Sequence, residues 1–171
     1  MRTVIRLAFL LSFAVAAHSP VLLAAPPAIS SETQVRQLLM GWEKAFRAKD
    51  VDAVMRVYAS GAAVVAYDVV PPLARIGRNT YRKNYEEFFA MYEGPLEIEF
   101  RDLRIVAGND VAFIHCLERV SGTLKGGQKS ETWLRVTSGL RRIKGNWFIV
   151  HDHVSVPVDL ETGKAALDLA P

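Results

Sequence analysis

The chain has 171 residues, of which 50% are hydrophobic, and a formal net charge of +3. This length and composition predict one domain with a normal hydrophobic core. Arg2 and Arg6 supply two of the positive charges, so the rest of the chain has a charge of only +1, which gives no indication of nucleic-acid binding. The single cysteine, Cys116, excludes an internal disulfide.

The first 25 residues have the pattern of a secretory signal peptide. Arg2 and Arg6 flank a short apolar run, and small residues follow up to Ala25. Cleavage is expected after Ala17 or, preferably, near Ala24. The apolar run is short for a membrane span, and no cysteine follows it as a lipid attachment site. The mature protein is therefore expected to be periplasmic or secreted, without a stable membrane anchor.

Three helices are expected in the first half of the domain. Residues 26–30 form a linker, and Ser31 precedes Gln34 at the spacing of a capping box. Asp50 can cap a second, shorter helix. A third helix follows Gly77 and ends at Gly94-Pro95. Its apolar side chains repeat at helical spacing: Tyr81, Tyr85, Phe88, Phe89 and Tyr92.

The remainder of the chain reads as strands separated by tight turns. We expect strands over residues 62–70, 96–107, 111–124, 130–142 and 146–156. Helices first and antiparallel strands later indicate an α+β fold. Long curved strands covered by three helices on one face would enclose a cone-shaped pocket, the usual place for a ligand. The domain is expected to span residues 31–159, followed by a tail at residues 160–171.

The last strand carries the most informative pattern in the chain. Because strand side chains alternate between faces, Asp152 falls in an otherwise apolar row. That row is Phe148, Val150, Asp152, Val154 and Val156, and the opposite row is Trp147, Ile149, His151, His153 and Ser155. A buried carboxylate is unfavourable unless it is paired or protonated. Asp152 is therefore a candidate catalytic residue.

The order of these elements resembles the nuclear transport factor two-like superfamily, and within it the SnoaL-like and ketosteroid isomerase-like group. The motifs that carry the resemblance are Trp42, Gly77, residues 108–112, residues 135–137 and residues 145–155. The last of these is also similar to the association domain of calmodulin-dependent kinases. The resemblance implies the cone-shaped fold over residues 31–159. It does not imply one activity, because this fold supports isomerases, cyclases, binding modules and assembly domains.

A polar cluster around Asp152 is expected in the pocket. On the neighbouring strand, Trp133 and Arg135 belong to a polar and aromatic row that we assign to the same face as Asp152. Arg135 would then keep Asp152 charged. The kinase association domain has a pocket arginine on the preceding strand, where this chain has His115. The resemblance therefore implies a cluster of His115, Arg135 and Asp152, which either binds ligand or only orders the sheet as an internal ion pair.

A second candidate base lies at the end of the first strand. Asp68 follows Tyr67 and precedes a Pro-Pro stop, so it is expected either at the mouth of the pocket or as the cap of a turn. Ketosteroid isomerases combine an aspartate base with phenolic or protonated donors that stabilise an enolate. Tyr58, Tyr67 or Tyr81 would supply such a phenol here.

The two histidines of the last strand have a different expected role. His151 and His153 lie on one face as a metal pair would, but a third ligand is missing, so no metal is expected. We expect them at a homodimer surface on the outer side of the sheet. Cys116 is interpreted as a core residue. The chain has no nucleophile elbow and no phosphate loop, and no cofactor is expected.

Two functions are compatible with these observations. The first is an exported protein that binds a small apolar or carboxylated molecule and processes it by isomerase-like or cyclase-like proton transfer, with Asp152 or Asp68 as the base. His115, Arg135, Trp133, Tyr58 and Tyr67 would contact the ligand. The second is a non-catalytic module that binds ligand or assembles as a homodimer.

Overall fold

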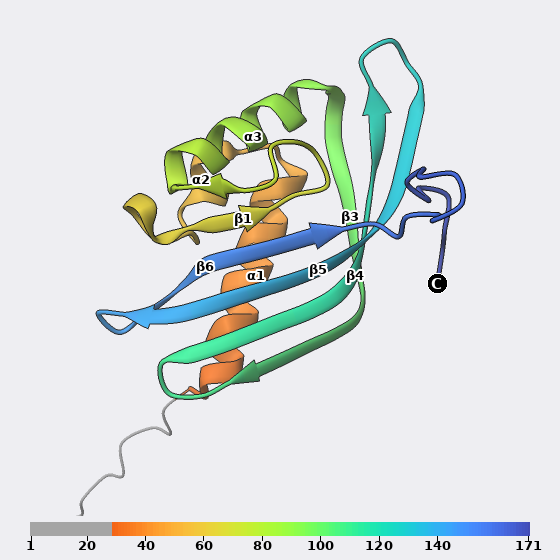
Figure 1. Ribbon diagram of the computed structural model, residues 1–171. Coiled ribbons are helices and arrows are strands. Elements are labelled where there is room, and N and C mark those ends of the chain that lie inside the picture. The colour runs from red at the N-terminus through yellow and green to blue at the C-terminus, as the bar shows by residue number, and fades with distance from the viewer. Residues whose placement is uncertain (1–28) are drawn as a thin grey trace, which may run out of the picture.

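In the computed structural model, residues 29–171 are described, and the expected signal peptide lies outside them. The described chain has an α+β fold with its helices in the N-terminal half, as expected (Figure 1). Its elements in chain order are α1 (Ser31–Arg47), α2 (Val51–Met55), η1 (Gly61–Ala63), β1 (Val65–Tyr67), β2 (Arg75–Ile76), α3 (Arg78–Ala90), β3 (Tyr92–Ala107), β4 (Val111–Leu124), β5 (Lys129–Ile143) and β6 (Asn146–Ser155).

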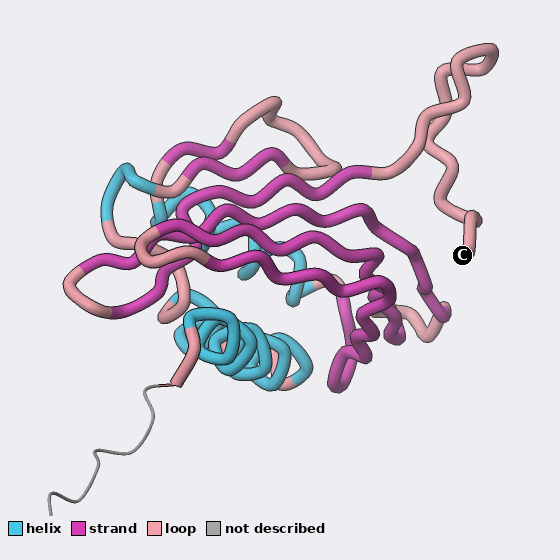
Figure 2. Tube along the Cα trace, turned by 90° about the horizontal axis from the view of Figure 1, so that it is seen from below, coloured by secondary structure: helices cyan, strands magenta, loops and turns pink. Residues whose placement is uncertain are grey.

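The six strands form one sheet in the order β2-β1-β6-β5-β4-β3. Strands β3 to β6 are a meander of antiparallel neighbours. The short β1 joins the edge of this meander parallel to β6, and β2 pairs antiparallel with β1. Figure 2 shows α1 almost end-on against one face of the sheet, whose strands curl round at one end. A concave surface therefore faces the helices.

The helix starts follow local capping chemistry. Ser30 caps α1, because its hydroxyl accepts a hydrogen bond from the backbone N–H of Thr33 at 3.1 Å. The expected cap at Ser31 is thus displaced by one residue. Asp50 caps α2 as predicted, accepting from the N–H of Ala53 at 2.9 Å.

Several elements differ from the prediction. The first predicted strand, residues 62–70, shortens to β1, and β2 was not predicted. The third helix ends at Ala90, and Gly94-Pro95 lies inside β3 instead of ending a helix. The pairing of β3 with β4 is irregular between Glu93 and Glu97, and β3 is an edge strand. A proline is tolerated there because its missing N–H interrupts no central ladder.

A β-bulge in β6 changes which residues share a face with Asp152. Gly139 pairs with His151 but Leu140 pairs with Ile149, so Val150 is an extra residue without a partner on β5. Trp147 and Ile149 are consequently buried on the same side as Asp152, whereas strict alternation placed them opposite it. We call the face that carries Asp152, Ser138 and Ile114 the inner face, and the other the outer face.

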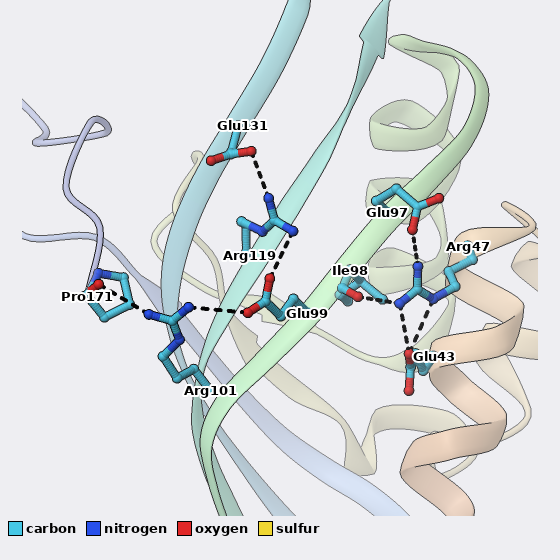
Figure 3. Close-up of polar contacts among 9 residues, drawn as sticks. All are labelled: Glu43, Arg47, Glu97, Ile98, Glu99, Arg101, Arg119, Glu131 and Pro171. Carbon is cyan, nitrogen blue, oxygen red and sulfur yellow. Dashed lines mark hydrogen bonds and ion pairs between the residues drawn. The ribbon is translucent and has the colours of Figure 1, made fainter.

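An ion pair and hydrogen bonds connect α1 and the tail to β3 (Figure 3). Arg47 of α1 pairs with Glu43 at 3.0 Å and also contacts Glu97 and the carbonyl of Ile98 on β3. Arg101 donates to the carbonyl oxygen of Pro171 at 3.2 Å, so the end of the tail lies beside β3.

No helix within residues 29–171 has the length and apolar character needed to cross a membrane.

Candidate functional site

The space between the inner face and the helices is a pocket of about 470 Å³. This volume lies within the range of small-molecule sites, about 300–1,000 Å³. Most of its wall is apolar, formed by side chains of α1, α3 and the sheet, including Trp42, Phe46, Phe88, Phe100 and Leu134. The polar groups in this wall have mainly apolar surroundings, so each of them has a large influence on what can bind.

Asp152 is the central polar group of the pocket wall, as its pattern predicted. It is 4% exposed and sits between β1 and β5. Tyr58 donates its phenolic proton to Oδ2 at 2.7 Å, and Ser138 donates to Oδ1 at 2.6 Å. Each carboxylate oxygen therefore has one fixed hydrogen bond, and the side chain is held in one orientation.

A chain of tyrosines continues from Asp152 toward α3. The hydroxyls of Tyr58 and Tyr85 are 2.7 Å apart. Because Tyr58 uses its only proton on Asp152, Tyr85 must be the donor to Tyr58. Burial raises the pKa of both phenols well above its ordinary value, and the charge of Asp152 adds to the shift. Both remain protonated donors. Tyr81, another candidate phenol, packs edge-on against the ring of Tyr58.

The same environment also changes the pKa of Asp152. Burial raises its pKa to about 6, and the hydrogen bonds from Ser138 and Tyr58 oppose that rise. A carboxylate with a pKa near neutrality is mostly ionised at pH 7 yet is a stronger base than an ordinary aspartate. Asp152 thus has the properties of a general base.

A second buried carboxyl group, Glu118, was missed by the sequence reasoning. It lines the pocket from β4 and is 7% exposed. Burial, with the charge of Asp152 as the second cause, raises its pKa to about 8. Glu118 is therefore mainly neutral at pH 7 and can donate a hydrogen bond. The signal for it was present, because it interrupts the buried row Ala112, Ile114, Cys116, Glu118 and Val120 as Asp152 interrupts its own row.

The predicted cluster of His115, Arg135 and Asp152 is not formed. The register pairs Ser138, not Arg135, with Asp152, so Arg135 lies on the outer face. There it is exposed and donates to the carbonyl of Val156 at 2.9 Å. His115 is likewise exposed on the outer face, where it stacks on Phe113.

Trp133 and Tyr67 also lie outside the pocket. Trp133 is on the outer face, with the guanidinium of Arg101 4.9 Å from its ring centroid. Tyr67 is 43% exposed and packs edge-on against His151 and His153. Of the five side chains predicted to contact ligand, only Tyr58 lines the cavity.

Asp68 lies at the pocket wall but differs from Asp152 in its surroundings. It is half-buried, its Oδ2 accepts from Asn84 at 2.6 Å, and its Oδ1 accepts from the N–H of Val69 at 2.7 Å. The bond to Val69 joins neighbouring residues after β1 and does not decide between the two roles predicted for Asp68. Its position on the wall keeps it a candidate for contact with a ligand.

Metal binding and thiol reactivity both depend on which side chains the described residues bring together. Within residues 29–171, no three His, Cys, Asp or Glu side chains gather in a way that could hold a metal ion. Cys116 lines the cavity, but burial raises its pKa to about 12. It is therefore an unreactive thiol at neutral pH, which agrees with its interpretation as a core residue.

Comparisons with known proteins identify the fold and the family. The sequence model of a family described as "SnoaL-like domain" matches residues 35–159. An NTF2-like protein of unknown function from Pseudomonas putida KT2440 is 34% identical, with a TM-score of 0.73, over 82% of this chain and 96% of that one. No curated protein matches the chain.

Two more distant structures share the fold. A ketosteroid isomerase-like protein from Erwinia carotovora atroseptica SCRI1043 is 19% identical, with a TM-score of 0.62, over 73% of this chain and 95% of that one. A candidate calcium/calmodulin-dependent protein kinase II association domain from Xanthomonas campestris is 22% identical, with a TM-score of 0.66, over 80% of this chain and 95% of that one. At these identities the likeness concerns the fold alone.

Proposed function

The chain belongs to the SnoaL-like domain family, and we propose that it binds a small apolar or carboxylated molecule and transfers a proton on it. The reaction would be of the isomerase or cyclase type and needs no cofactor. We further propose that the protein is exported, because its first 25 residues have the signal-peptide pattern.

One observation carries this proposal: two buried carboxyl groups with different pKa values share one apolar pocket. Asp152 has a pKa of about 6 and Glu118 a pKa of about 8. Near pH 7 the first is mainly a base and the second mainly an acid. Carboxyl groups whose environments separate their pKa values commonly divide the roles of base and acid.

The proposed step is proton abstraction from a carbon next to a carbonyl group. Asp152 takes the proton, and the electron pair of the broken C–H bond moves onto the carbonyl oxygen to form an enolate. Neutral Glu118 donates a hydrogen bond to that oxygen, and Asp152 returns the proton to another carbon. Tyr58 and Ser138 hold Asp152 in place throughout. General acid–base catalysis of this kind contributes about 10²–10⁴-fold in rate.

The first test is native mass spectrometry of the mature protein purified from its own host. We expect a retained small molecule, whose mass identifies the ligand class. The mass of the protein also reports whether the leader was removed near Ala17 or Ala24. An intact N-terminus would contradict export with cleavage.

The second test compares Asp152→Asn with Glu131→Gln, a matched change on the outer side of β5. With the identified ligand, Asp152→Asn should bind but lose about 10²-fold or more of the turnover. Glu131→Gln should keep both. If Asp152→Asn turns over normally in a folded protein, Asp152 is not the base.

A second candidate function is assembly through the outer face. Tyr67 and Phe113 are 43% and 44% exposed there; Tyr67 packs against His151 and His153, and Phe113 stacks on His115. Exposed aromatic side chains of this kind favour a protein contact, and we propose a homodimer. Sedimentation velocity should show a dimer that Phe113→Glu converts to a monomer. A monomeric wild-type protein would exclude this function.

A further inference from the structure

Arg75 is a buried cation in the wall of the pocket. It is 9% exposed and lies on β2, a two-residue strand at the edge of the sheet. The register pairs Arg75 with Ala66, and Ala66 in turn with Asp152. These three residues therefore form one row across the inner face, and both charged members of the row line the cavity.

The guanidinium of Arg75 lacks a counter-charge among the described residues. Its Nη2 donates to the carbonyl oxygen of Pro71 at 2.7 Å, while its buried Nε–H has no acceptor. None of the ion pairs within residues 29–171 involves it. A buried charge without an opposite charge destabilises the folded state. An anion bound at Arg75 would therefore stabilise the folded protein.

The two aspartates on this part of the wall are already engaged elsewhere. Asp152 accepts from Tyr58 and Ser138, and Asp68 accepts from Asn84 and the N–H of Val69. The free donors of Arg75 are thus available to a molecule inside the cavity. A guanidinium presents them as a planar fork, which matches the two oxygens of a carboxylate.

Ala66 sets the distance between the cation and the candidate base. Neighbouring strands are about 4.8 Å apart, so the backbones of Arg75 and Asp152 are separated by about 10 Å. Ala66 lies between them in the row, but it is fully buried and does not line the cavity. A carboxylate bound at Arg75 would therefore place the remaining carbons of a small molecule in the same cavity as Asp152.

We propose that Arg75 is the anion-binding residue of the pocket and that the ligand is a small apolar molecule with a single carboxylate group. This inference rests on the proposed function and narrows its substrate class. One carboxylate neutralises one guanidinium. A phosphate dianion would leave an excess negative charge in the row that contains Asp152.

The test uses two probes that differ only in charge, 3-phenylpropionate and its neutral amide, 3-phenylpropionamide. Binding to the mature protein is measured by isothermal titration calorimetry at about pH 7.5, where an ordinary carboxylic acid is ionised. We expect the carboxylate to bind about tenfold to a hundredfold more tightly, the range for hydrogen bonds to charged groups. Arg75→Met should abolish this preference, and Arg75→Lys should restore part of it.

Arg104→Gln is the matched control, since Arg104 is an exposed arginine whose partner in the register, His115, lies on the outer face. It should leave the preference for the carboxylate over the amide unchanged.

The melting temperature of unliganded Arg75→Met supplies an independent readout. We expect it to equal or exceed that of the wild type, because the variant removes an uncompensated buried charge. A merely structural arginine would instead lower it.

The outcomes separate the two proposals. If the wild-type protein binds the amide as tightly as the carboxylate, the pocket function stands and the role of Arg75 is wrong. The same conclusion follows if Arg75→Met is strongly destabilised while the preference persists. If neither probe binds the wild-type protein, both the carboxylate class and the proposed pocket function are contradicted.

Discussion

The two faces of the sheet use the same strands in opposite ways. Along β4, the inner positions are buried, whereas alternate outer positions such as Phe113 and His115 face solvent. Carboxyl groups on the inner face, Asp152 and Glu118, have raised pKa values because burial disfavours their charge. On the outer face, Arg119 instead forms half-exposed ion pairs with Glu99 and Glu131 (Figure 3). A carboxyl group of this sheet therefore has a raised pKa on the inner face and forms an ion pair on the outer face.

The largest difference between the faces should appear in core truncations. Leu140, on the inner face of β5, is 1% exposed. Leu140→Ala should lower the free energy of unfolding by about 2–5 kcal/mol, because it removes buried methyl groups and leaves a cavity. Phe113→Ala on the outer face should lower it by less than about 1 kcal/mol. Urea denaturation of both variants checks this, and equal losses would contradict the distinction.

The buried carboxyl groups should make the protein more stable in mild acid than in mild base. Their folded pKa values, about 6 for Asp152 and about 8 for Glu118, exceed the ordinary values of 3.8 and 4.5. The folded state therefore binds more protons between those limits, and stability falls as the pH rises through them. The free energy of unfolding should drop by roughly a few kcal/mol between about pH 5 and about pH 8.5.

Two variants separate the contributions of Glu118 and Asp152 to this pH dependence of stability. Glu118→Gln should remove most of the fall above about pH 6, whereas Asp152→Asn should remove roughly half of the fall between about pH 5 and about pH 6, where both groups contribute. The exposed control Glu131→Gln should leave the curve unchanged. Chemical denaturation at a series of pH values measures all three. A wild-type protein that becomes more stable from about pH 5 to about pH 8 would show that these carboxyl groups are not buried as described.

Replacing a glycine by alanine on each face should have a smaller effect on stability than the core truncations. A Cβ at Gly122, on the inner face, would lie 2.8 Å from Leu96 Cδ2 and 2.9 Å from Tyr92 Cδ1. Gly122→Ala should cost about 1–3 kcal/mol through overpacking. A Cβ at Gly139, on the outer face, would meet only His151 Cβ at 3.5 Å. Gly139→Ala should stay within about 0.5 kcal/mol of the wild type in thermal unfolding.

The smallest effects are expected from the outer residues that sequence reasoning assigned to the pocket. Arg135→Ala and His115→Ala should change ligand affinity by less than about twofold, because surface substitutions away from a site seldom exceed about 0.5 kcal/mol. Tyr58→Phe is the inner counterpart. It removes a donor to Asp152, so the pKa of Asp152 should rise, which carbon-13 NMR titration of that carboxyl group can follow. A large loss of affinity in Arg135→Ala would place the ligand site on the outer face.

Much of the candidate site could be read from residue patterns. Asp152 stood out because a lone carboxylate in an apolar row is unfavourable without a function or a partner. The same reasoning applied to Glu118 and would have identified it. Ser138 and Tyr85 had no such signal, since a serine or tyrosine is common on either face. Arg75 had no such signal either, because the two-residue strand that buries it has no recognisable periodicity.

Local spacing and hydrophobic alternation were enough to predict the α+β order of elements, the family resemblance and the burial of Asp152. The partners of Asp152, in contrast, depend on how the strands pair in space. The bulge at Val150 and the pairing of Ser138 with Asp152 set the register, and a shift of one residue exchanges the inner and outer faces of a strand. Register depends on contacts between distant parts of the chain. For that reason Arg135 lies outside the pocket, whereas Arg75 and Glu118 lie in its wall.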